Sequence, residues 1–205
     1  MRRTVGIIDY GAGNLSSVQR AFQRLGHRAR VTDDVEVLDA ADLLVLPGVG
    51  AFPHAMEQLA AHGLDRYVCD AARAGRPLLG ICLGMQLLVE ESEEQRLTAG
   101  LGLLPGRVAA LPGGGWHIGW NRLEVTGPDP LFRPSDRESV YFNHRFAVEV
   151  PSPYCAAMAR ASAGLVAAIR RDRIVGLQFH PEKSQAAGRA LLERIVDGLC
   201  AEPAR

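Results

Sequence analysis

The chain has 205 residues, of which 47% are hydrophobic and 22% charged, and its formal net charge at pH 7 is zero. This composition is typical of a globular domain, and the neutral balance argues against nucleic acid or an acidic membrane surface as the main partner. No apolar run is long enough to span a membrane, and the charged start is too short for a signal peptide. The sequence therefore predicts one domain, residues 1–205, in the cytoplasm.

The first half of the chain alternates apolar strands with helical patterns. The spacing of apolar residues predicts strands at 4–9, 29–32, 42–46 and 78–81, and helices at 14–25, 52–61, 65–74 and 83–91. Alternation of this kind builds a parallel sheet with helices on both faces. Ligands of such sheets bind at the carboxyl ends of the strands.

The second half changes to short strands with turn residues between them. Strands are predicted at 107–111, 121–125, 139–142, 146–150 and 155–160, then a hairpin of 165–170 and 173–179, and a closing helix at 185–199. The predicted fold class is therefore α/β. It is a three-layer, open, mostly parallel sheet with helices on both faces and an antiparallel extension in the second half.

A cysteine stands where the strand at 78–81 gives way to a helix. Glycines flank it at two residues to either side, in Gly80-Ile81-Cys82-Leu83-Gly84. Glycines at these positions make room for a sharp turn that presents a nucleophile. The start of a helix favours the thiolate, which is the reactive form. This pattern predicts that Cys82 is a nucleophile.

The other cysteines carry no comparable signal. Cys69, Cys155 and Cys200 are widely spaced, and no C-x-x-C pair occurs. The spacing argues against a zinc site and against a disulfide framework. We interpret these three as small buried hydrophobic residues, and we predict neither a metal site nor a cofactor.

The tripeptide His180-Pro181-Glu182 follows a strongly apolar strand near the end of the chain. In an extended segment, residues two apart point to the same side, so His180 and Glu182 are predicted to project together. A histidine can take the proton of a thiol, and a carboxylate can fix the tautomer of that histidine. An isolated His-Pro-Glu is more often a surface turn. The upstream cysteine favours a triad of Cys82, His180 and Glu182.

These two motifs together resemble the class I (triad) glutamine amidotransferases. Four further segments resemble one subfamily, the glutaminase subunits of imidazole glycerol phosphate synthase in histidine biosynthesis. They are Ile8–Leu15, His117–Asn121, Tyr141–His144 and the ending His180–Ser184. The resemblance covers essentially the whole chain.

The resemblance implies glutamine as the substrate. The Cys82 thiolate attacks the side-chain amide, His180 protonates the leaving ammonia, and Glu182 orients His180. Water then hydrolyses the glutamyl thioester to glutamate.

The resemblance also implies an oxyanion hole. The backbone N–H of Leu83 is one expected donor, and a second is expected near Val49 or Gly50. Gln86 and Gly48 are the expected contacts to glutamine.

The resemblance further implies a heterodimer with a (β/α)₈-barrel cyclase subunit that receives the ammonia and makes imidazole glycerol phosphate and AICAR. Of 23 basic residues, 22 are arginines and one, Lys183, is a lysine beside the triad. A compact ammonium makes a directed contact where a planar guanidinium does not fit. Lys183 is thus predicted to contact the partner. Trp120 and Tyr141 are interface residues by the same resemblance, although half-buried sheet aromatics would explain them equally well.

Three positions depart from the pattern of the subfamily. Arg145 stands where a small hydroxyl residue is usual, Asn143 replaces an apolar residue, and Gly113–Gly115 form an insert. These departures concern the glutamine pocket and partner docking rather than the triad.

Three alternatives follow from the same residues. The chain could be the glutaminase of another amidotransferase, such as pyridoxal-phosphate synthase or an anthranilate-type enzyme. It could be a peptidase-like or chaperone-like relative with a cysteine elbow, or a catalytically silent subunit. The opening Asp9–Leu15 and Lys183-Ser184 argue against the first, and the intact triad argues against the others.

Overall fold

The computed structural model describes residues 1–160 and 164–201. Its strands are β1 (Thr4–Ile8), β2 (Arg28–Thr32), β3 (Leu43–Gly48), β4 (Leu78–Cys82), β5 (Glu91–Ser92), β6 (Thr98–Ala99), β7 (Arg107–Ala110), β8 (His117–Val125), β9 (Ser139–His144), β10 (Phe146–Glu149), β11 (Cys155–Ala159), β12 (Leu165–Arg171) and β13 (Ile174–Leu177). Its α-helices are α1 (Leu15–Arg24), α2 (Val35–Asp39), α3 (Phe52–Ala61), α4 (Leu64–Arg73), α5 (Leu83–Leu87) and α6 (Gln185–Leu199).

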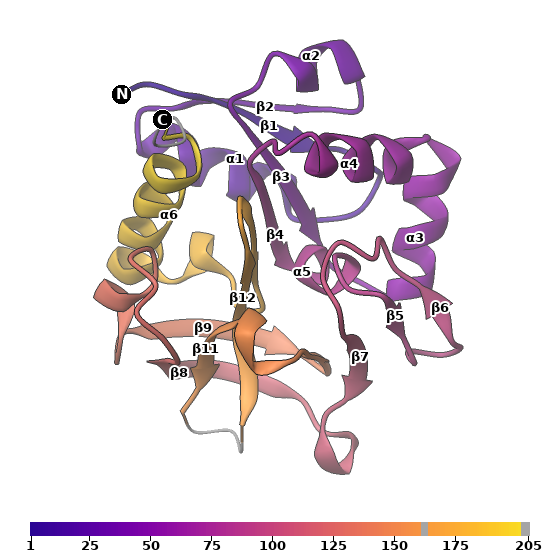
Figure 1. Ribbon diagram of the computed structural model, residues 1–205, viewed down its shortest axis with the longest axis vertical. Helices are drawn as coiled ribbons and strands as arrows, with labels where there is room; N and C mark the ends of the chain where they lie inside the picture. The colour runs from indigo at the N-terminus through magenta and orange to yellow at the C-terminus, as the bar shows by residue number, and fades with distance from the viewer. Residues whose placement is uncertain (161–163, 202–205) are drawn as a thin grey trace.

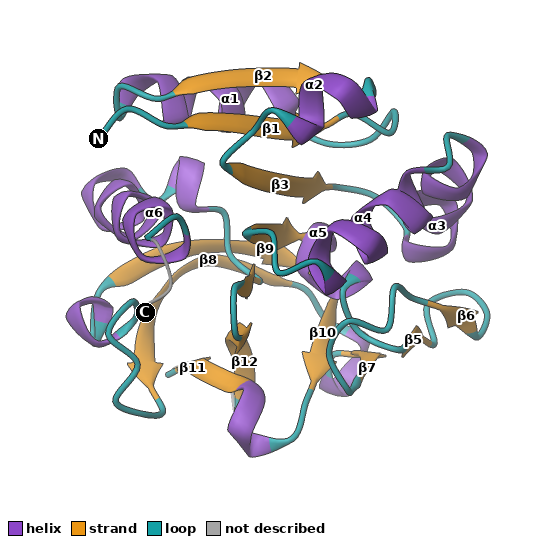
Figure 2. Ribbon diagram, turned by 45° about the horizontal axis from the view of Figure 1, so that its top comes forward, coloured by secondary structure: helices purple, strands orange, loops and turns teal. Residues whose placement is uncertain are grey.

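The strands form two sheets. Within the described residues, the main sheet has nine strands in the order β2-β1-β3-β4-β13-β12-β11-β8-β9. The pairs from β2 to β13 are parallel, and the pairs from β13 to β9 are antiparallel. A smaller sheet of four strands, β10-β7-β5-β6, lies beside it (Figure 2). The predicted parallel sheet with an antiparallel extension is confirmed.

Helices cover both faces of the parallel part. Figure 1 shows α1 and α6 on one side of the sheet and α3, α4 and α5 on the other. Alternate residues of β1 divide between the two cores, since Ile7 packs with α1 and α6 while Ile8 packs with α2 and α3. This division reflects the two-residue period of a strand buried on both faces. The three-layer prediction is therefore confirmed.

The parallel register sets two loops side by side. Strands β3 and β4 pair so that Gly48 lies opposite Cys82. Both residues end their strands at the carboxyl edge of the sheet, where ligands bind in such folds. The next strand along, β13, ends three residues before His180 and brings it to the same edge.

One predicted helix is much shorter than expected. The pattern at 83–91 predicts a helix, but α5 ends at Leu87 and the chain enters β5 at Glu91. The carbonyls of Leu87 and Leu88 accept hydrogen bonds from the backbone N–H groups of Leu101 and Leu103, both at 2.9 Å. Tertiary pairing thus replaces the next helical turn. The sequence also gave no signal for α2, β5 or β6.

A substitution at Gly84 tests how closely α5 sits on β3. A Cβ atom at this position would lie 1.8 Å from the carbonyl oxygen of Leu46. We expect Gly84→Ala to lower the free energy of unfolding by about 3 kcal/mol, because backbone must move to admit the methyl group. Gly115→Ala is the control, since no heavy atom lies within 4 Å of its Cβ position. Urea unfolding measures both, and equal losses would contradict the prediction.

Candidate active site

Cys82 occupies a strained turn between β4 and α5. Its backbone angles are φ 55° and ψ −112°, which non-glycine residues rarely adopt and which cost about 1–3 kcal/mol. The side chain is nearly buried, with 7% of the residue exposed. The fold therefore places Cys82 in a tight turn between a strand and a helix at the edge of the sheet, as the flanking glycines predicted.

His180 and Glu182 form a buried pair beside Cys82. Nδ1 of His180 lies 2.9 Å from Oε1 of Glu182, and their side chains are 4% and 1% exposed. Burial lowers the pKa of His180, but its interactions with the Cys82 sulfur and with the Glu182 carboxylate raise it, to about 9 in all. The second carboxylate oxygen of Glu182 is buried without a hydrogen-bond partner among the described residues. This histidine is thus placed to hold a proton next to the thiol.

The backbone between His180 and Glu182 is not extended, and this part of the prediction is wrong. Pro181–Lys183 form a 3₁₀ turn, in which the N–H of Lys183 donates to the carbonyl of His180 at 3.0 Å. Proline suits the first position of such a turn because its missing N–H has no partner there. The side chains still meet, because the turn folds Glu182 back onto the imidazole.

The loop after β3 lies against the start of α5. Leu83 is the first residue of α5, where the helix itself provides no acceptor for the backbone N–H. A Cβ atom on Gly48 would lie 2.7 Å from the Tyr10 hydroxyl and 2.9 Å from the Gly84 nitrogen, so only glycine allows this approach. The Tyr10 hydroxyl donates to the carbonyl of Pro47 at 2.8 Å and supports the loop from below.

A cavity of about 390 Å³ opens above Cys82. It collects most of the predicted site residues. Its lining comprises Val49, Gly50, Cys82, Leu83, Gln86, Glu94, Trp116, Asn143, His144, Arg145, Phe146, His180 and Lys183. Gly48, a predicted glutamine contact, is buried under the loop and does not line it.

Two lining residues carry opposite charges that the sequence analysis did not connect. Oε2 of Glu94 accepts a hydrogen bond from the backbone N–H of Phe52 at 2.8 Å, which holds this carboxylate at the start of α3. Arg145, identified above only as a departure, contributes a guanidinium. A cavity that offers both charges suits a zwitterionic amino acid. Glu94 lies in a loop without periodicity, so no sequence signal could have found it.

Polar residues behind the cavity are held by one another. The amide nitrogen of Gln86 donates to the carbonyl of Phe146 at 2.9 Å and to Oε1 of Gln178 at 3.1 Å. The amide nitrogen of Gln178, which is fully buried, lies 4.0 Å from the Cys82 sulfur. In the sequence, Gln178 lies two residues before His180, but nothing in its spacing marks it as a site residue.

The three predicted interface residues come together beside the cavity. The rings of Trp120 and Tyr141 lie edge to face, with centroids 5.9 Å apart. Nζ of Lys183 lies 6.0 Å from the centroid of the Tyr141 ring. Ile118, on the same strand as Trp120, is 60% exposed. Trp116, directly before this strand, is 64% exposed. Neither of these was predicted from the sequence, although alternation along β8 points all three outward.

The glycine insert, Gly113–Gly115, directly precedes the exposed Trp116. Pro112–Gly114 form a 3₁₀ turn, and Trp116 follows it at the mouth of the cavity. Asn143, the second departure, has its carbonyl oxygen 4.0 Å from the Cys82 sulfur. Two of the departures, Asn143 and Arg145, therefore line the candidate site, and the glycine insert lies next to the lining residue Trp116.

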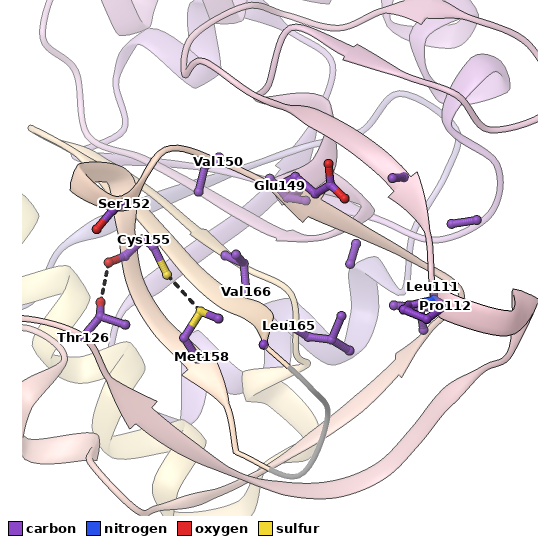
Figure 3. A pocket seen from close by; sticks show the side chains of 15 residues that line it. Leu111, Pro112, Thr126, Glu149, Val150, Ser152, Cys155, Met158, Leu165 and Val166 are labelled. Atoms are coloured by element: carbon purple, nitrogen blue, oxygen red, sulfur yellow. Dashed lines mark hydrogen bonds between the residues drawn. The ribbon is translucent and has the colours of Figure 1, made fainter.

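A larger cavity, of about 590 Å³, lies between β11 and β12 of the main sheet and β7 and β10 of the smaller one (Figure 3). None of the triad residues lines it. Its one thiol belongs to Cys155, whose sulfur lies 3.3 Å from that of Met158, and burial raises the pKa of this thiol. A thiol that stays protonated is a poor nucleophile. Among the described lining residues, this thiol has no histidine beside it, whereas Cys82 and His180 line the smaller cavity together.

Residues 1–160 and 164–201 contain no group of three or more histidine, cysteine, aspartate or glutamate side chains arranged to hold a metal ion. Within the same ranges, no helix is long and apolar enough to cross a membrane.

Comparisons with solved structures show the same fold. The structure of PurLQS from Thermotoga maritima superposes with a TM-score of 0.76 at 20% identity, covering 97% of this chain and 100% of that one. A glutamine amidotransferase from Thermotoga maritima superposes with a TM-score of 0.74 at 18% identity, covering 98% and 100%.

Comparisons of sequence are more specific. The family model of glutamine amidotransferase class-I matches residues 6–197. The imidazole glycerol phosphate synthase subunit HisH of Syntrophotalea carbinolica is 47% identical, over 93% of this chain and 98% of that protein. The HisH subunit of Symbiobacterium thermophilum is 48% identical, over 91% and 90%. The chain therefore belongs to the class-I glutamine amidotransferases and, among them, to the family of imidazole glycerol phosphate synthase HisH subunits.

Proposed function

We propose that this chain is the glutaminase subunit of an imidazole glycerol phosphate synthase, working in the cytoplasm as a single domain of residues 1–205. It hydrolyses glutamine and supplies the ammonia to a cyclase subunit. The observation that carries the proposal is the strained Cys82 at the base of a cavity, next to the buried pair of His180 and Glu182.

The proposed reaction begins with proton transfer from the Cys82 thiol to His180. The thiolate attacks the side-chain carbonyl carbon of glutamine, and His180 returns the proton to the nitrogen as ammonia leaves. His180 then takes a proton from water, whose oxygen attacks the thioester and releases glutamate. Glu182 accepts a hydrogen bond from Nδ1 throughout and so keeps Nε2 facing the reacting groups.

The developing oxyanion needs donors beside the sulfur. The N–H of Leu83, which has no helical partner, is the first proposed donor. A backbone N–H of the loop at Val49 or Gly50 is the second, because the register places this loop next to Cys82. Loss of one such donor typically lowers the rate by about 10²–10³-fold.

The charges of the cavity suggest how glutamine is oriented. We place its α-ammonium group near Glu94 and its α-carboxylate near Arg145, with the side chain pointing to Cys82. Gln86 lines the same cavity. Charge-assisted hydrogen bonds at the far end of the substrate would select an amino acid over a simple amide.

The exposed side of β8 is the proposed docking surface for the cyclase, a (β/α)₈ barrel. Trp116, Ile118 and Trp120 are apolar and exposed there, close to Tyr141 and Lys183. Large aromatic residues are enriched at protein interfaces. Docking at this place would put the exit of ammonia against the partner, before it is protonated by water.

Glutamine hydrolysis by the purified chain tests the proposal. We expect weak turnover alone and a large stimulation by the cyclase subunit with its nucleotide ligand bound. Glutamate release is measured in both states. A full rate without the partner would contradict the dependence on docking, and no hydrolysis in the complex would refute the function.

Lys183→Arg tests the role of the single lysine. The ammonium group lies over Tyr141, and a planar guanidinium cannot occupy the same place with the same direction. If Lys183 pairs with a partner carboxylate, the variant should lose about tenfold of the partner-stimulated rate, equal to about 1.4 kcal/mol. Arg189→Lys is the control, and an unchanged stimulated rate in Lys183→Arg would disprove this role.

A further inference from the structure

A run of side chains links β8 to the back of the candidate site. The amide nitrogen of Asn121 lies 2.6 Å from Nε2 of His117. Nδ1 of His117 lies 2.8 Å from Nε2 of His144, and Nδ1 of His144 lies 2.8 Å from the carbonyl oxygen of Phe146. The two histidines are 9% and 5% exposed, so this run lies inside the protein.

The chemistry of the acceptor fixes the direction of every step. A carbonyl oxygen only accepts, so Nδ1 of His144 carries the hydrogen and its Nε2 is an acceptor. His117 must then donate from Nδ1, and its Nε2 accepts from the amide of Asn121. Burial lowers the pKa of both histidines, that of His144 to about 4 although its bond to Phe146 acts against burial. Both rings are therefore neutral, and a single tautomer of each satisfies all the contacts.

The same carbonyl joins this run to the catalytic sulfur. The Phe146 oxygen also accepts from the amide nitrogen of Gln86, whose second hydrogen goes to Oε1 of Gln178. The oxygen of the Gln178 amide is thereby occupied as an acceptor, and its amide nitrogen lies 4.0 Å from the Cys82 sulfur. Gln86 has used both of its donors, so the polar atom it retains for a ligand is an acceptor.

We propose that Asn121, His117, His144, Gln86 and Gln178 form one hydrogen-bond relay, whose two branches both donate to the Phe146 carbonyl. The relay positions the Cys82 sulfur and holds Gln86 as an acceptor for an N–H group of glutamine. The inference rests on the proposed glutaminase function and adds to it. His117 and Asn121 are positioning residues, because they reach the reacting atoms only through other side chains. The relay also starts on the strand whose other face carries Trp116, Ile118 and Trp120.

Two substitutions at His117 separate the effect of losing the hydrogen bond from the effect of losing the ring. Phenylalanine keeps a ring that can stack on Phe142, where the centroids are now 4.5 Å apart, but it removes the donor. Asparagine removes the ring and keeps an N–H near the position of Nδ1. In the complex with the cyclase, we expect His117→Phe to lower kcat for glutamine hydrolysis about tenfold, and His117→Asn to stay within about threefold of the wild type. KM should change less than kcat.

The rate of alkylation of Cys82 measures the reactivity of its sulfur, which a change in packing alone would not alter. Iodoacetamide is applied to the complex, and the Cys82 peptide is followed by mass spectrometry because Cys69, Cys155 and Cys200 are also thiols. We expect slower alkylation in His117→Phe and near-normal alkylation in His117→Asn. Equal rates in all three proteins, or a larger defect in His117→Asn, would overturn the relay.

Asn121→Leu provides a second test if His117→Phe does not fold. Leucine has about the size of asparagine but cannot donate, so Nε2 of His117 loses its hydrogen-bond partner and the hydrogen is no longer held on Nδ1, where it faces His144. We expect the same fall in kcat, about tenfold. A wild-type complex without glutaminase activity would refute the proposed function itself. An active wild type with an unaffected Asn121→Leu would refute only the relay.

Discussion

Replacing Cys82 with alanine is expected to abolish glutamine hydrolysis, with a fall in kcat of at least about 10⁴-fold. Among the described residues that line the cavity, Cys82 carries the only sulfur, and no other side chain can form the thioester. The complex should still use ammonia supplied in solution, because the acceptor reaction belongs to the cyclase. Glutamate release and ammonia-dependent product formation are measured on the same preparation.

Cys155→Ala is the matched control for this experiment. Cys155 is a half-buried thiol that lines the larger cavity, away from the triad (Figure 3). Its substitution should leave hydrolysis unchanged. Loss of the ammonia-dependent reaction in Cys82→Ala would show that the complex no longer assembles. Persistent hydrolysis in that variant would mean that the nucleophile has been misassigned.

Replacing Glu182 with glutamine is expected to lower kcat by about 10³–10⁴-fold. The shape is kept, but a neutral amide no longer stabilises the protonated imidazole that forms during the reaction. It can also donate to Nδ1 of His180 and so select the wrong tautomer. Glu124→Gln, an exposed carboxylate on β8, is the control. A fall below tenfold in Glu182→Gln would show that His180 does not need its carboxylate.

The same pair predicts how stability depends on pH. Burial lowers the pKa of His180, but Cys82 and Glu182 raise it above the ordinary 6.5, to about 9. The folded chain thus holds this proton more tightly than the unfolded chain. The resulting stabilisation is complete below pH 6.5 and is lost as the pH rises through about 9. We expect the midpoint of thermal unfolding to fall over this interval, and to fall less in Glu182→Gln. Parallel curves would contradict the assignment.

Cys82, the proposed nucleophile, lies in a strained turn that several elements pack against. Gly84 and Gly48 allow α5 and the loop after β3 to press against the turn at Cys82. Gln86 and Gln178 then fill the space behind the sulfur with hydrogen bonds. Because the strain at Cys82 is local, contacts of this kind from several elements are needed to hold it.

Short-range patterns predicted the parallel half of the fold well. The strand at 78–81 and the helix at 52–61 come from continuous or periodic apolar residues that need no distant partner to be recognised. The helix predicted at 83–91 was wrong because its last carbonyls bond to residues 101–104. No local pattern can report a competition with a segment so far along the chain.

The sequence by itself determined which residues could do the chemistry. Glycines around Cys82 required a tight turn, and the motif at His180 supplied a base and a carboxylate within one short segment. These are properties of residue type and close spacing, so they can be recognised without the fold.

Only the tertiary structure decided which residues surround that chemistry. Gln178 directly follows β13, whose register with β4 brings it close to Cys82. Glu94 reaches the same cavity from the loop after β5, and Arg145 from the turn between β9 and β10. The tautomers of His117 and His144 likewise follow from a carbonyl acceptor, which no side-chain pattern can reveal. Contacts between distant segments depend on how the sheet is assembled, and that assembly is a property of the whole chain.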